Sequence, residues 1–439
     1  MVMRYIFRNA SIFFSMVMLL ACVIHNNAFT IMPSSPLFGV RPSSLHTTRS
    51  ETSSTSNNLQ TALDETNIEN EELNLPRMSI STPLKFVGPY ACLGLRFPKL
   101  ATSAQRERNV TGVSLDFMVD TAANINVINA QVAKELQLPV VGQAPGGVGS
   151  SGAMMDGASI FSLGDTYLEK VLQPQITKDD DEEPSMFMQG LTASALTVAS
   201  PASAGILSYA FLSCFEGGVE FKWGDTSKGM GISTSSGETN DTALVPSLVF
   251  YGGNDDGKED GLVLDQMTKV NISPTPVTML PTITILMNGF EVQALLDTGS
   301  PITVLNKAAA ESAAIETFEK SPDQTTKKSN PFASVVNLFQ EGKEQSMAAQ
   351  RGELVMIPGA DGQPVCLYRS KDDVDIGFAT SDGSSLKFKP SPVFVGDIPG
   401  LAALNGLGDD SPPAMILGMD VLRTRSSMFL RAQSNEVYF

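Results

Sequence analysis

Histidine is almost missing from this chain of 439 residues. The two histidines, His25 and His46, both fall within the first 50 residues, a segment that we expect to be removed for reasons given below. The mature chain would then contain no histidine. It could not run a Ser-His-Asp or Cys-His mechanism, and it would lack the commonest ligand of transition metals.

Cysteine is scarce as well, with four residues in the whole chain. Cys22 lies in the N-terminal apolar run, whereas Cys92, Cys214 and Cys366 are far apart and show no Cys-x-x-Cys spacing. This spacing argues against a structural zinc site and against a dense disulfide framework. We therefore expect no metal and no cofactor, and we interpret the three later cysteines as small buried hydrophobic residues.

Positively charged residues are also few relative to acidic residues. The chain has 30 Lys and Arg residues against 47 Asp and Glu residues, which gives a formal net charge of −17. Residues 1–50 contain four arginines and no acidic residue, so their removal gives −17 − 4 = −21. A surface of this sign repels phosphate, and nucleic acid is not an expected partner.

Residues 1–28 have the order of a signal peptide. Arg4 and Arg8 precede the apolar run from Ile12 to Ile24, which is too short to span a bilayer comfortably. We expect cleavage near Ala28. Once this segment is removed, no membrane partner is expected.

The stretch from Phe29 to Ser50 is rich in Ser, Thr and Pro, and Arg41 and Arg49 are its only charges. That composition is typical of a transit peptide. With Ala-Phe at the junction, the leader resembles the bipartite presequence that directs proteins into the plastids of secondary-endosymbiotic algae. The expected destination is a plastid reached through the secretory pathway. Secretion or retention in the endomembrane lumen is the alternative, because Asn26 fits the small-residue cleavage pattern poorly.

The most informative motif is the string Leu-Leu-Asp-Thr-Gly-Ser at 295–300. A weaker copy, Met-Val-Asp-Thr-Ala-Ala, stands at 118–123, and the two aspartates are 297 − 120 = 177 positions apart. The same ungapped shift also matches three further pairs, which are Val127 with Val304, Asn129 with Asn306, and Ala133 with Ala310. The chain therefore contains two related halves, each with one Asp-Thr loop.

A hairpin is predicted before the second Asp loop, and a similar closing element follows each of the two loops. The segment from Thr282 to Met287, the turn Asn288-Gly289 and the segment from Phe290 to Leu296 predict a hairpin that places Asp297 at a strand end. Met415–Leu422 resembles the Ile-Leu-Gly-x-Asp-x-Leu element that closes a retropepsin lobe, and Gly205–Leu212 lies the same way behind Asp120. From Met78 to Phe439 the chain thus resembles tandem retropepsin-like or pepsin-like aspartic proteases.

This resemblance implies a pair of catalytic carboxylates, Asp120 and Asp297. In such enzymes two carboxylates about 3 Å apart hold one water, and because like charges this close cannot both ionise, the pair keeps one proton near neutral pH. One carboxyl then acts as a base towards the water while the other donates to the scissile carbonyl. The supporting loop residues implied by the motif are Thr121, Ala122, Thr298, Gly299 and Ser300.

Two features of the first half depart from the family pattern. Ala122 stands where the family usually has glycine, and its Cβ is expected to crowd the approach of the two loops. Ala210 stands where the second closing element has Asp420. After the first loop, a glycine-rich stretch is the candidate flap, although a plain surface loop is the alternative; its glycines are Gly146, Gly147, Gly149 and Gly152.

Frequent Gly and Pro with short branched runs favour an all-β architecture. The resemblance implies that it is a bilobal aspartic-protease fold made of two related retropepsin-like lobes with the active site between them. We expect helices mainly after each Asp loop, at Ala130–Leu138 and Lys307–Phe318. The predicted divisions are a transit peptide and disordered segment at 29–77, a first lobe at 78–225, a linker at 226–271 and a second lobe at 272–439. Within the linker, the apolar run Ala243–Tyr251 is a candidate shared strand.

The sequence therefore predicts an aspartic endopeptidase, a hydrolase that cuts an extended polypeptide substrate by means of the Asp120/Asp297 pair. A monomer is expected, because the first lobe already supplies the partner of the second. The alternative is a catalytically attenuated, protease-like module that binds extended peptides without cleaving them, since Ala122 departs from the family pattern. Fold alone does not decide between them.

Overall fold

The computed structural model describes residues 79–144, 147–148, 154–155, 158–172, 186–196, 203–224, 245–252, 264, 267–275, 278–319, 345–358, 364–379, 385–398, 401 and 412–439. The predicted signal peptide, transit peptide and disordered segment at 1–77 lie outside these residues. Among the described residues, no helix is long and apolar enough to cross a membrane.

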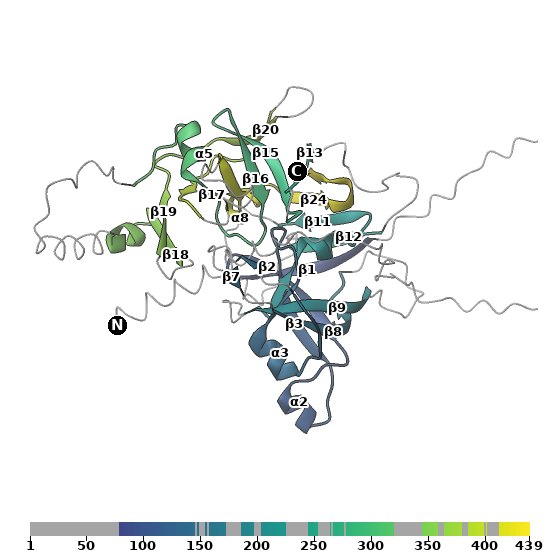
Figure 1. Ribbon diagram of the computed structural model, residues 1–439. Helices are drawn as coiled ribbons and strands as arrows, with labels where there is room; N and C mark the ends of the chain where they lie inside the picture. The colour runs from purple at the N-terminus through teal and green to yellow at the C-terminus, as the bar shows by residue number, and fades with distance from the viewer. Residues whose placement is uncertain are drawn as a thin grey trace, which may run out of the picture.

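The first lobe consists mainly of strands, with three short helices (Figure 1). Its elements are β1 (Ser79–Val87), β2 (Tyr90–Phe97), α2 (Ser103–Glu107), β3 (Val113–Val119), β4 (Val127–Asn129), α3 (Ala130–Leu136), β5 (Val140–Gln143), β6 (Gly147–Val148), β7 (Met154–Met155), β8 (Ser159–Leu168), β9 (Phe187–Leu196), β10 (Gly205–Leu207), α4 (Tyr209–Leu212) and β11 (Gly218–Lys222). Strands β12 (Ser247–Tyr251) and β13 (Lys269–Asn271) follow it.

The second lobe repeats this plan and appears in green to yellow in Figure 1. Its elements are β14 (Ser273–Pro274), β15 (Pro281–Met287), β16 (Phe290–Leu296), β17 (Val304–Leu305), α5 (Lys307–Ser312), β18 (Leu354–Pro358), β19 (Pro364–Arg369), β20 (Ile376–Ala379), β21 (Ser385–Lys387), β22 (Phe394–Val395), β23 (Ala414–Leu417), α8 (Met419–Leu422), β24 (Ser427–Arg431), the 3-10 helix η4 (Ala432–Ser434) and β25 (Glu436–Tyr438).

The two halves have equivalent strand pairings. In the first, β10 runs parallel to β3 and antiparallel to β4; in the second, β23 runs parallel to β16 and antiparallel to β17. The matched asparagines also act alike, because Asn129 caps α3 and Asn306 caps α5 through their side-chain oxygens. The repeat seen in the sequence is therefore a repeat of structure.

A six-stranded sheet joins the lobes, in the order β13-β25-β24-β11-β12-β1. Its central pair is β11 of the first lobe and β24 of the second, with Val219 opposite Leu430. Strand β12 covers the other side of β11, so the apolar run proposed as a shared strand lies in the sheet that the lobes have in common. Each lobe thus contributes three strands arranged in the same way about the β11–β24 pair.

The predicted hairpin before Asp297 is confirmed. β15 and β16 pair antiparallel with Met287 opposite Phe290, and the turn residues Asn288 and Gly289 have φ values of 48° and 85°, as a type I′ turn requires. Alternate residues of β15 are fully buried, since Ile283, Ile285 and Met287 have no exposed surface. The apolar face of this hairpin anchors the second Asp loop to the core.

The helices after the two Asp loops are present where the sequence placed them, but both end earlier. α3 ends at Leu136, because Gln137 adopts a left-handed conformation with φ of 54°. α5 ends at Ser312, shortly before Ala314, whose φ is 52°. The structure is mostly β and bilobal, as predicted, with one plan of strand pairing repeated in the two halves.

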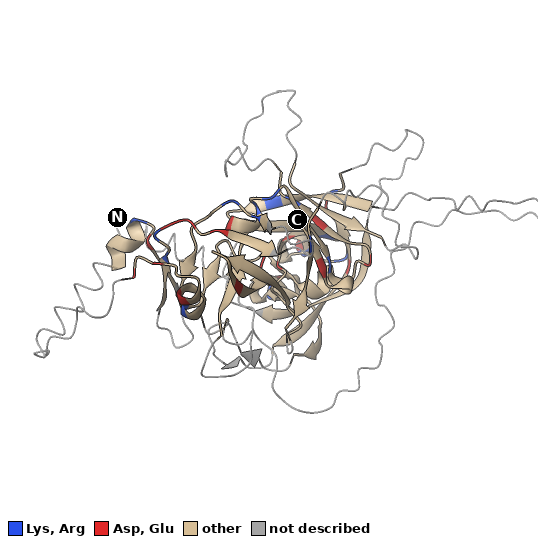
Figure 2. Cartoon of the chain, turned by 90° about the horizontal axis from the view of Figure 1, so that it is seen from above, with Lys and Arg blue, Asp and Glu red and all other residues tan. Residues whose placement is uncertain are grey.

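Charged residues of both signs are interspersed over the described elements (Figure 2). Some form ion pairs, and Lys85 Nζ lies 2.8 Å from Asp116 Oδ1 and 2.6 Å from Glu169 Oε2. These side chains are partly exposed, so each pair contributes roughly 0–1 kcal/mol to stability. The buried apolar core, rather than these pairs, determines the positions of the strands that carry the site.

Candidate active site

The two motif aspartates stand at the ends of equivalent strands. Asp120 follows β3 and is 0% exposed, and Asp297 follows β16 and is 3% exposed. The backbone N–H of Asp120 donates to Leu207 O at 2.9 Å, and that of Asp297 donates to Leu417 O at 3.1 Å. Each closing element therefore fixes the start of the Asp loop in its own lobe.

The two loops are locked together by their threonines. The Thr121 N–H donates to the Thr298 hydroxyl at 3.1 Å, and the Thr298 N–H donates to the Thr121 hydroxyl at 3.0 Å. Each hydroxyl also donates across the interface, Thr121 to Leu296 O at 2.6 Å and Thr298 to Val119 O at 2.9 Å. All four bonds join residues of different lobes and are buried. They hold the two aspartates side by side.

Gly299 lets the loops approach closely, because it lies directly against the Asp120 carboxyl. A Cβ built on Gly299 would overlap the Asp120 carboxyl atoms. The φ of Gly299 is not in the left-handed region. Glycine is therefore needed here for space rather than for backbone conformation.

The crowding expected from Ala122 does not occur. Ala122 is fully buried and belongs to an apolar cluster with second-lobe residues that include Leu295 and Ile416. The reciprocal threonine bonds form in its presence. Its methyl group consequently packs against the second lobe and does not keep the loops apart.

Backbone N–H groups of the following loop residues support the carboxyl of each aspartate. Asp297 Oδ1 accepts the N–H groups of Gly299 at 2.8 Å and Ser300 at 2.9 Å. Asp120 Oδ1 accepts the Ala122 N–H at 2.8 Å, and within the described residues its Oδ2 is buried without a hydrogen-bond partner. The two loops thus support their carboxyls in a similar way, through the N–H groups of the residues two and three places after each aspartate.

Both carboxyls have raised pKa values. Burial and then the charge of Asp297 raise the pKa of Asp120 well above its ordinary value, although the N–H groups of Ala122 and Ala123 act against this shift. Burial raises the pKa of Asp297 to about 7, against the N–H groups of Gly299 and Ser300. The pair can therefore retain a proton at mildly acidic to neutral pH, as acid–base chemistry at this site requires.

A second layer of hydrogen bonds ties each Asp loop to its closing element, and different residues do this in each lobe. Asn126 Oδ1 accepts the N–H and hydroxyl of Ser208, both at 3.0 Å. In the second lobe, the Thr303 hydroxyl accepts the Gly418 N–H at 3.0 Å and donates to Asp420 at 2.7 Å. Sequence reasoning missed this layer, and the 177-residue shift could have found it, since it superposes Asn126 on Thr303.

Replacing Thr303 by valine should destabilise the chain by about 1–3 kcal/mol, because the change keeps the volume but leaves the buried Gly418 N–H without an acceptor and removes one of the donors to Asp420. Urea denaturation would measure the change in the free energy of unfolding. Thr284→Val is the matched control, since Thr284 is an exposed residue of β15, and a change within about 0.5 kcal/mol is expected there. Equal stability of both variants would contradict a supporting role for Thr303.

The candidate flap lies partly within the described residues. β6 contains Gly147 and pairs antiparallel with β7, while Gly146, Gly149 and Gly152 lie outside them. The second lobe forms a hairpin from β18 and β19, and these strands occupy the places that β5 and β8 have in the first lobe. Five residues separate β18 from β19, whereas the stretch from β5 to β8 also contains the β6–β7 hairpin.

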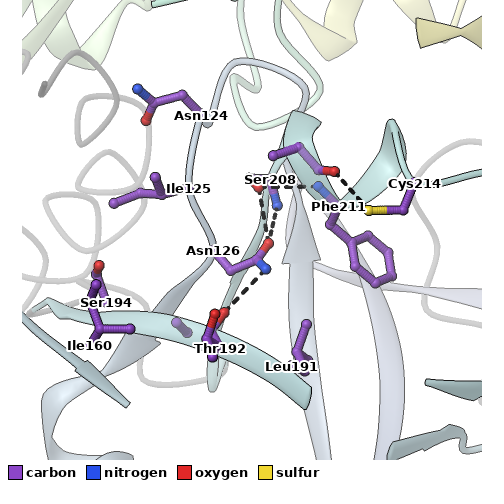
Figure 3. A pocket seen from close by; sticks show the side chains of 12 residues that line it. Asn124, Ile125, Asn126, Ile160, Leu191, Thr192, Ser194, Ser208, Phe211 and Cys214 are labelled. Carbon is purple, nitrogen blue, oxygen red and sulfur yellow. Dashed lines mark hydrogen bonds between the residues drawn. The ribbon is translucent and has the colours of Figure 1, made fainter. Parts of the chain in front are cut away.

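A cavity of about 330 Å³ lies beside the first Asp loop (Figure 3). Asn124, Ile125 and Asn126 line one side of it, and residues of β8, β9 and α4 line the others. The lining is mostly apolar and includes Ile160, Leu191 and Phe211. Asn126 Nδ2 donates to Thr192 O at 3.2 Å across this wall. The cavity can accommodate an apolar side chain close to the first Asp loop.

The described residues contain no group of three or more His, Cys, Asp or Glu side chains placed to hold a metal. Cys92 is buried, and burial raises the pKa of its thiol to about 12. Cys366 is partly exposed and Cys214 is exposed, so the prediction of three buried cysteines is wrong for Cys214. Cys214 lies at the rim of the first-lobe cavity, where its thiol donates to Ala210 O at 3.3 Å.

Comparison with known proteins finds likeness in structure alone. No protein-family model matches the sequence, and no curated protein matches it. Basic 7S globulin from soybean gives a TM-score of 0.38 at 9% identity, over 83% of this chain and 95% of that one. Conglutin gamma, a basic 7S globulin from lupine seeds, gives 0.38 at 10%, over 83% and 95%, and edgp gives 0.36 at 10%, over 82% and 94%. No family is assigned from these values.

Proposed function

We propose that the chain is an aspartic endopeptidase that uses Asp120 and Asp297 as its catalytic pair. The observation that carries this proposal is the reciprocal bonding of Thr121 and Thr298, which places two buried carboxyls with raised pKa values side by side. These hydrogen bonds do not stabilise either lobe by itself, because each of them joins one lobe to the other. It serves to bring two acids together.

The proposed peptide-bond hydrolysis depends on the proton that the two carboxyls share. An ionised carboxylate of the pair takes a proton from a water molecule as the water oxygen bonds to the scissile carbonyl carbon. The protonated partner donates its proton to the carbonyl oxygen, so the tetrahedral intermediate is neutral. When the C–N bond breaks, the carboxyl that gained the water proton delivers it to the leaving nitrogen. The other carboxylate recovers a proton from the intermediate, and the pair returns to its starting state.

The substrate class proposed is an extended polypeptide, bound between the lobes with one apolar side chain in the first-lobe cavity. Ala210 is an exposed residue on the wall of that cavity. Ala210→Phe should narrow the cavity and lower kcat/KM roughly tenfold or more for peptides with a large apolar side chain at the corresponding position. Kinetics on paired peptides would measure this, and peptides with alanine at that position should be cut as before. An equal effect on both peptides would contradict the assignment of the cavity.

Peptide-library digestion by the purified mature chain, across acidic to neutral pH, tests the proposed activity. Cleavage that a transition-state-mimicking aspartic protease inhibitor blocks would support it. Folded protein that cuts no peptide in a broad library under any of these conditions would overturn it.

A second candidate function is peptide binding without turnover. The near-complete burial of Asp120 and Asp297 favours it, since the attacking water must reach both carboxyls. In this case the mature chain should bind library peptides and release them intact. Mass spectrometry of the bound and released peptides separates the two candidates.

A further inference from the structure

We propose that Asn109 is a site of N-linked glycosylation, at the end of the first lobe that lies away from the Asp loops. Glycosylation requires entry into the secretory pathway, as the N-terminal leader predicts, and it is independent of peptidase activity. After residue 50, the sequence Asn-x-Ser/Thr without a central proline occurs at 109–111, 240–242 and 271–273. This sequence is the acceptor for N-linked oligosaccharides.

Asn109 lies in the turn that ends α2, where its backbone is fixed and its side chain is free. Its φ is 54°. Its N–H donates to Arg106 O at 3.0 Å, and the N–H of Val110 donates to Gln105 O at 2.9 Å. Asn109, Val110 and Thr111 are all exposed. In the part of the chain that the structure describes, the side chains of Asn109 and Thr111 make no hydrogen bond. The acceptor amide is therefore presented to solvent on an ordered turn.

The left-handed backbone explains the asparagine but not the threonine. Asparagine is favoured over most other residues at positive φ, so Asn109 alone is no evidence of a modification. Thr111 is exposed two residues later, and its hydroxyl has no partner among the described residues. Neither packing nor hydrogen bonding accounts for a threonine at this position. Its hydroxyl is, however, the group that the acceptor sequence requires.

The acceptor sequence at 271–273 has different surroundings. Asn271 pairs with Glu436 in the six-stranded sheet, and Ser273 pairs with Thr282 in the second-lobe sheet. Between them, Ile272 is 5% exposed and belongs to the apolar core. Residues 240–242 lie outside the described residues. Of the two acceptor sequences that the structure describes, only the one at Asn109 lies outside the strands.

A branched oligosaccharide on Asn109 would stand away from the catalytic pair. Figure 1 shows α2 at the end of the first lobe that is farthest from the second lobe, whereas Asp120 and Asp297 lie where the lobes meet. The glycan would adjoin Val110, which is 49% exposed. N-linked sugars are bulky and solubilising. Modification here would therefore shield an exposed apolar side chain and leave the Asp loops accessible.

The modification is a group transfer from a lipid-diphosphate-linked oligosaccharide. The side-chain nitrogen of Asn109 forms a bond to the anomeric carbon of the first sugar, while the bond from that carbon to a diphosphate oxygen breaks. The amide loses one proton, and the lipid diphosphate leaves with the electron pair of the broken bond. Donor and transferase act in the lumen of the endoplasmic reticulum, so the glycan would mark passage of the chain through that compartment.

Mass spectrometry of the full chain, expressed with its own leader in a eukaryotic host that glycosylates proteins, tests this assignment. An amidase that releases N-linked glycans in water enriched in heavy oxygen converts each glycosylated asparagine into labelled aspartate. Trypsin cuts after Arg108 and Lys134 and gives the peptide 109–134, in which Asn109 is the only acceptor. The other asparagines of this peptide control for spontaneous deamidation, and they are Asn124, Asn126 and Asn129.

The variants are made at Thr111, because replacing Asn109 would also change the left-handed turn. Asn109 should be labelled in the wild type and should remain labelled in Thr111→Ser, which keeps the hydroxyl. The label should be lost completely in Thr111→Ala. A threonine with a purely structural role would not separate these two variants in this way.

Absence of the label at Asn109 in the wild type, or equal labelling in Thr111→Ala, would overturn the assignment. Labelling of Asn240 or Asn271 without labelling of Asn109 would overturn it as well. Peptide cleavage should be the same in all three chains, since α2 lies far from the Asp loops. Because the label is read without turnover, a chain that binds peptides without cleaving them would still give the predicted result.

Discussion

Asp297→Asn should lower kcat/KM for peptide cleavage by about 10²- to 10⁴-fold while the chain stays folded. The change removes one of the two carboxyls through which the proposed mechanism moves protons, and general acid–base catalysis contributes about this much to rate. Asparagine has nearly the same shape as aspartate, and its Oδ1 can still accept the N–H groups of Gly299 and Ser300. Steady-state kinetics with a cleaved library peptide would measure the loss.

The control for this variant is Asp420→Asn. Asp420 is a partly buried acid of the same lobe that bonds to Thr303, behind the Asp297 loop. Activity within a few-fold of the wild type is expected there. If Asp297→Asn retained turnover, the proposed mechanism would be excluded. If Asp297→Asn were inactive and Asp120→Asn active, a dimer of second lobes would become the preferred arrangement.

Gly299→Ala should also abolish cleavage, by at least about 10²-fold, because its Cβ would overlap the Asp120 carboxyl. The catalytic pair must then separate, and catalytic groups need to be held to within about half an ångström. Overpacking of a buried site costs about 1–3 kcal/mol, so unfolding should occur at lower denaturant concentration. Kinetics and urea denaturation would measure the two effects.

The matched variant in the other loop is Ala122→Gly, for which the structure and the sequence motif suggest different outcomes. The motif suggests that glycine would bring the loops closer and raise activity. In the structure the Ala122 methyl fills an apolar cluster of the second lobe, so its removal should cost about 1 kcal/mol and leave kcat nearly unchanged. A large gain in kcat would show that Ala122 does hold the loops apart.

The sequence alone predicted those parts of the molecule that depend on local patterns. Strand alternation and the Asn288-Gly289 turn indicated the β15–β16 hairpin, and the 177-residue shift related the two Asp loops and the capping asparagines. The fold class followed from these features. Each is encoded within a few neighbouring residues or by direct similarity between the halves.

Features that depend on remote partners could not be predicted in this way. The cluster around Ala122 is made of second-lobe side chains, so a comparison of loop sequences treats its methyl group as an obstacle. The 177-residue shift superposes Asn126 on Thr303, but the task that they share depends on hydrogen bonds to Ser208 and Gly418, which the two different residue types do not reveal.

The strand pairing in the six-stranded sheet fixes the order in which parts of the chain can fold during synthesis. Ser79 in β1 pairs with Tyr251 in β12, so the first lobe cannot close its side of the sheet until the ribosome has released the chain beyond that residue. The other edge of β11 stays unpaired for longer, because its partner strand, β24, is almost the last strand to be synthesised. During this interval a nascent first lobe carries an open strand edge, which can pair with other chains.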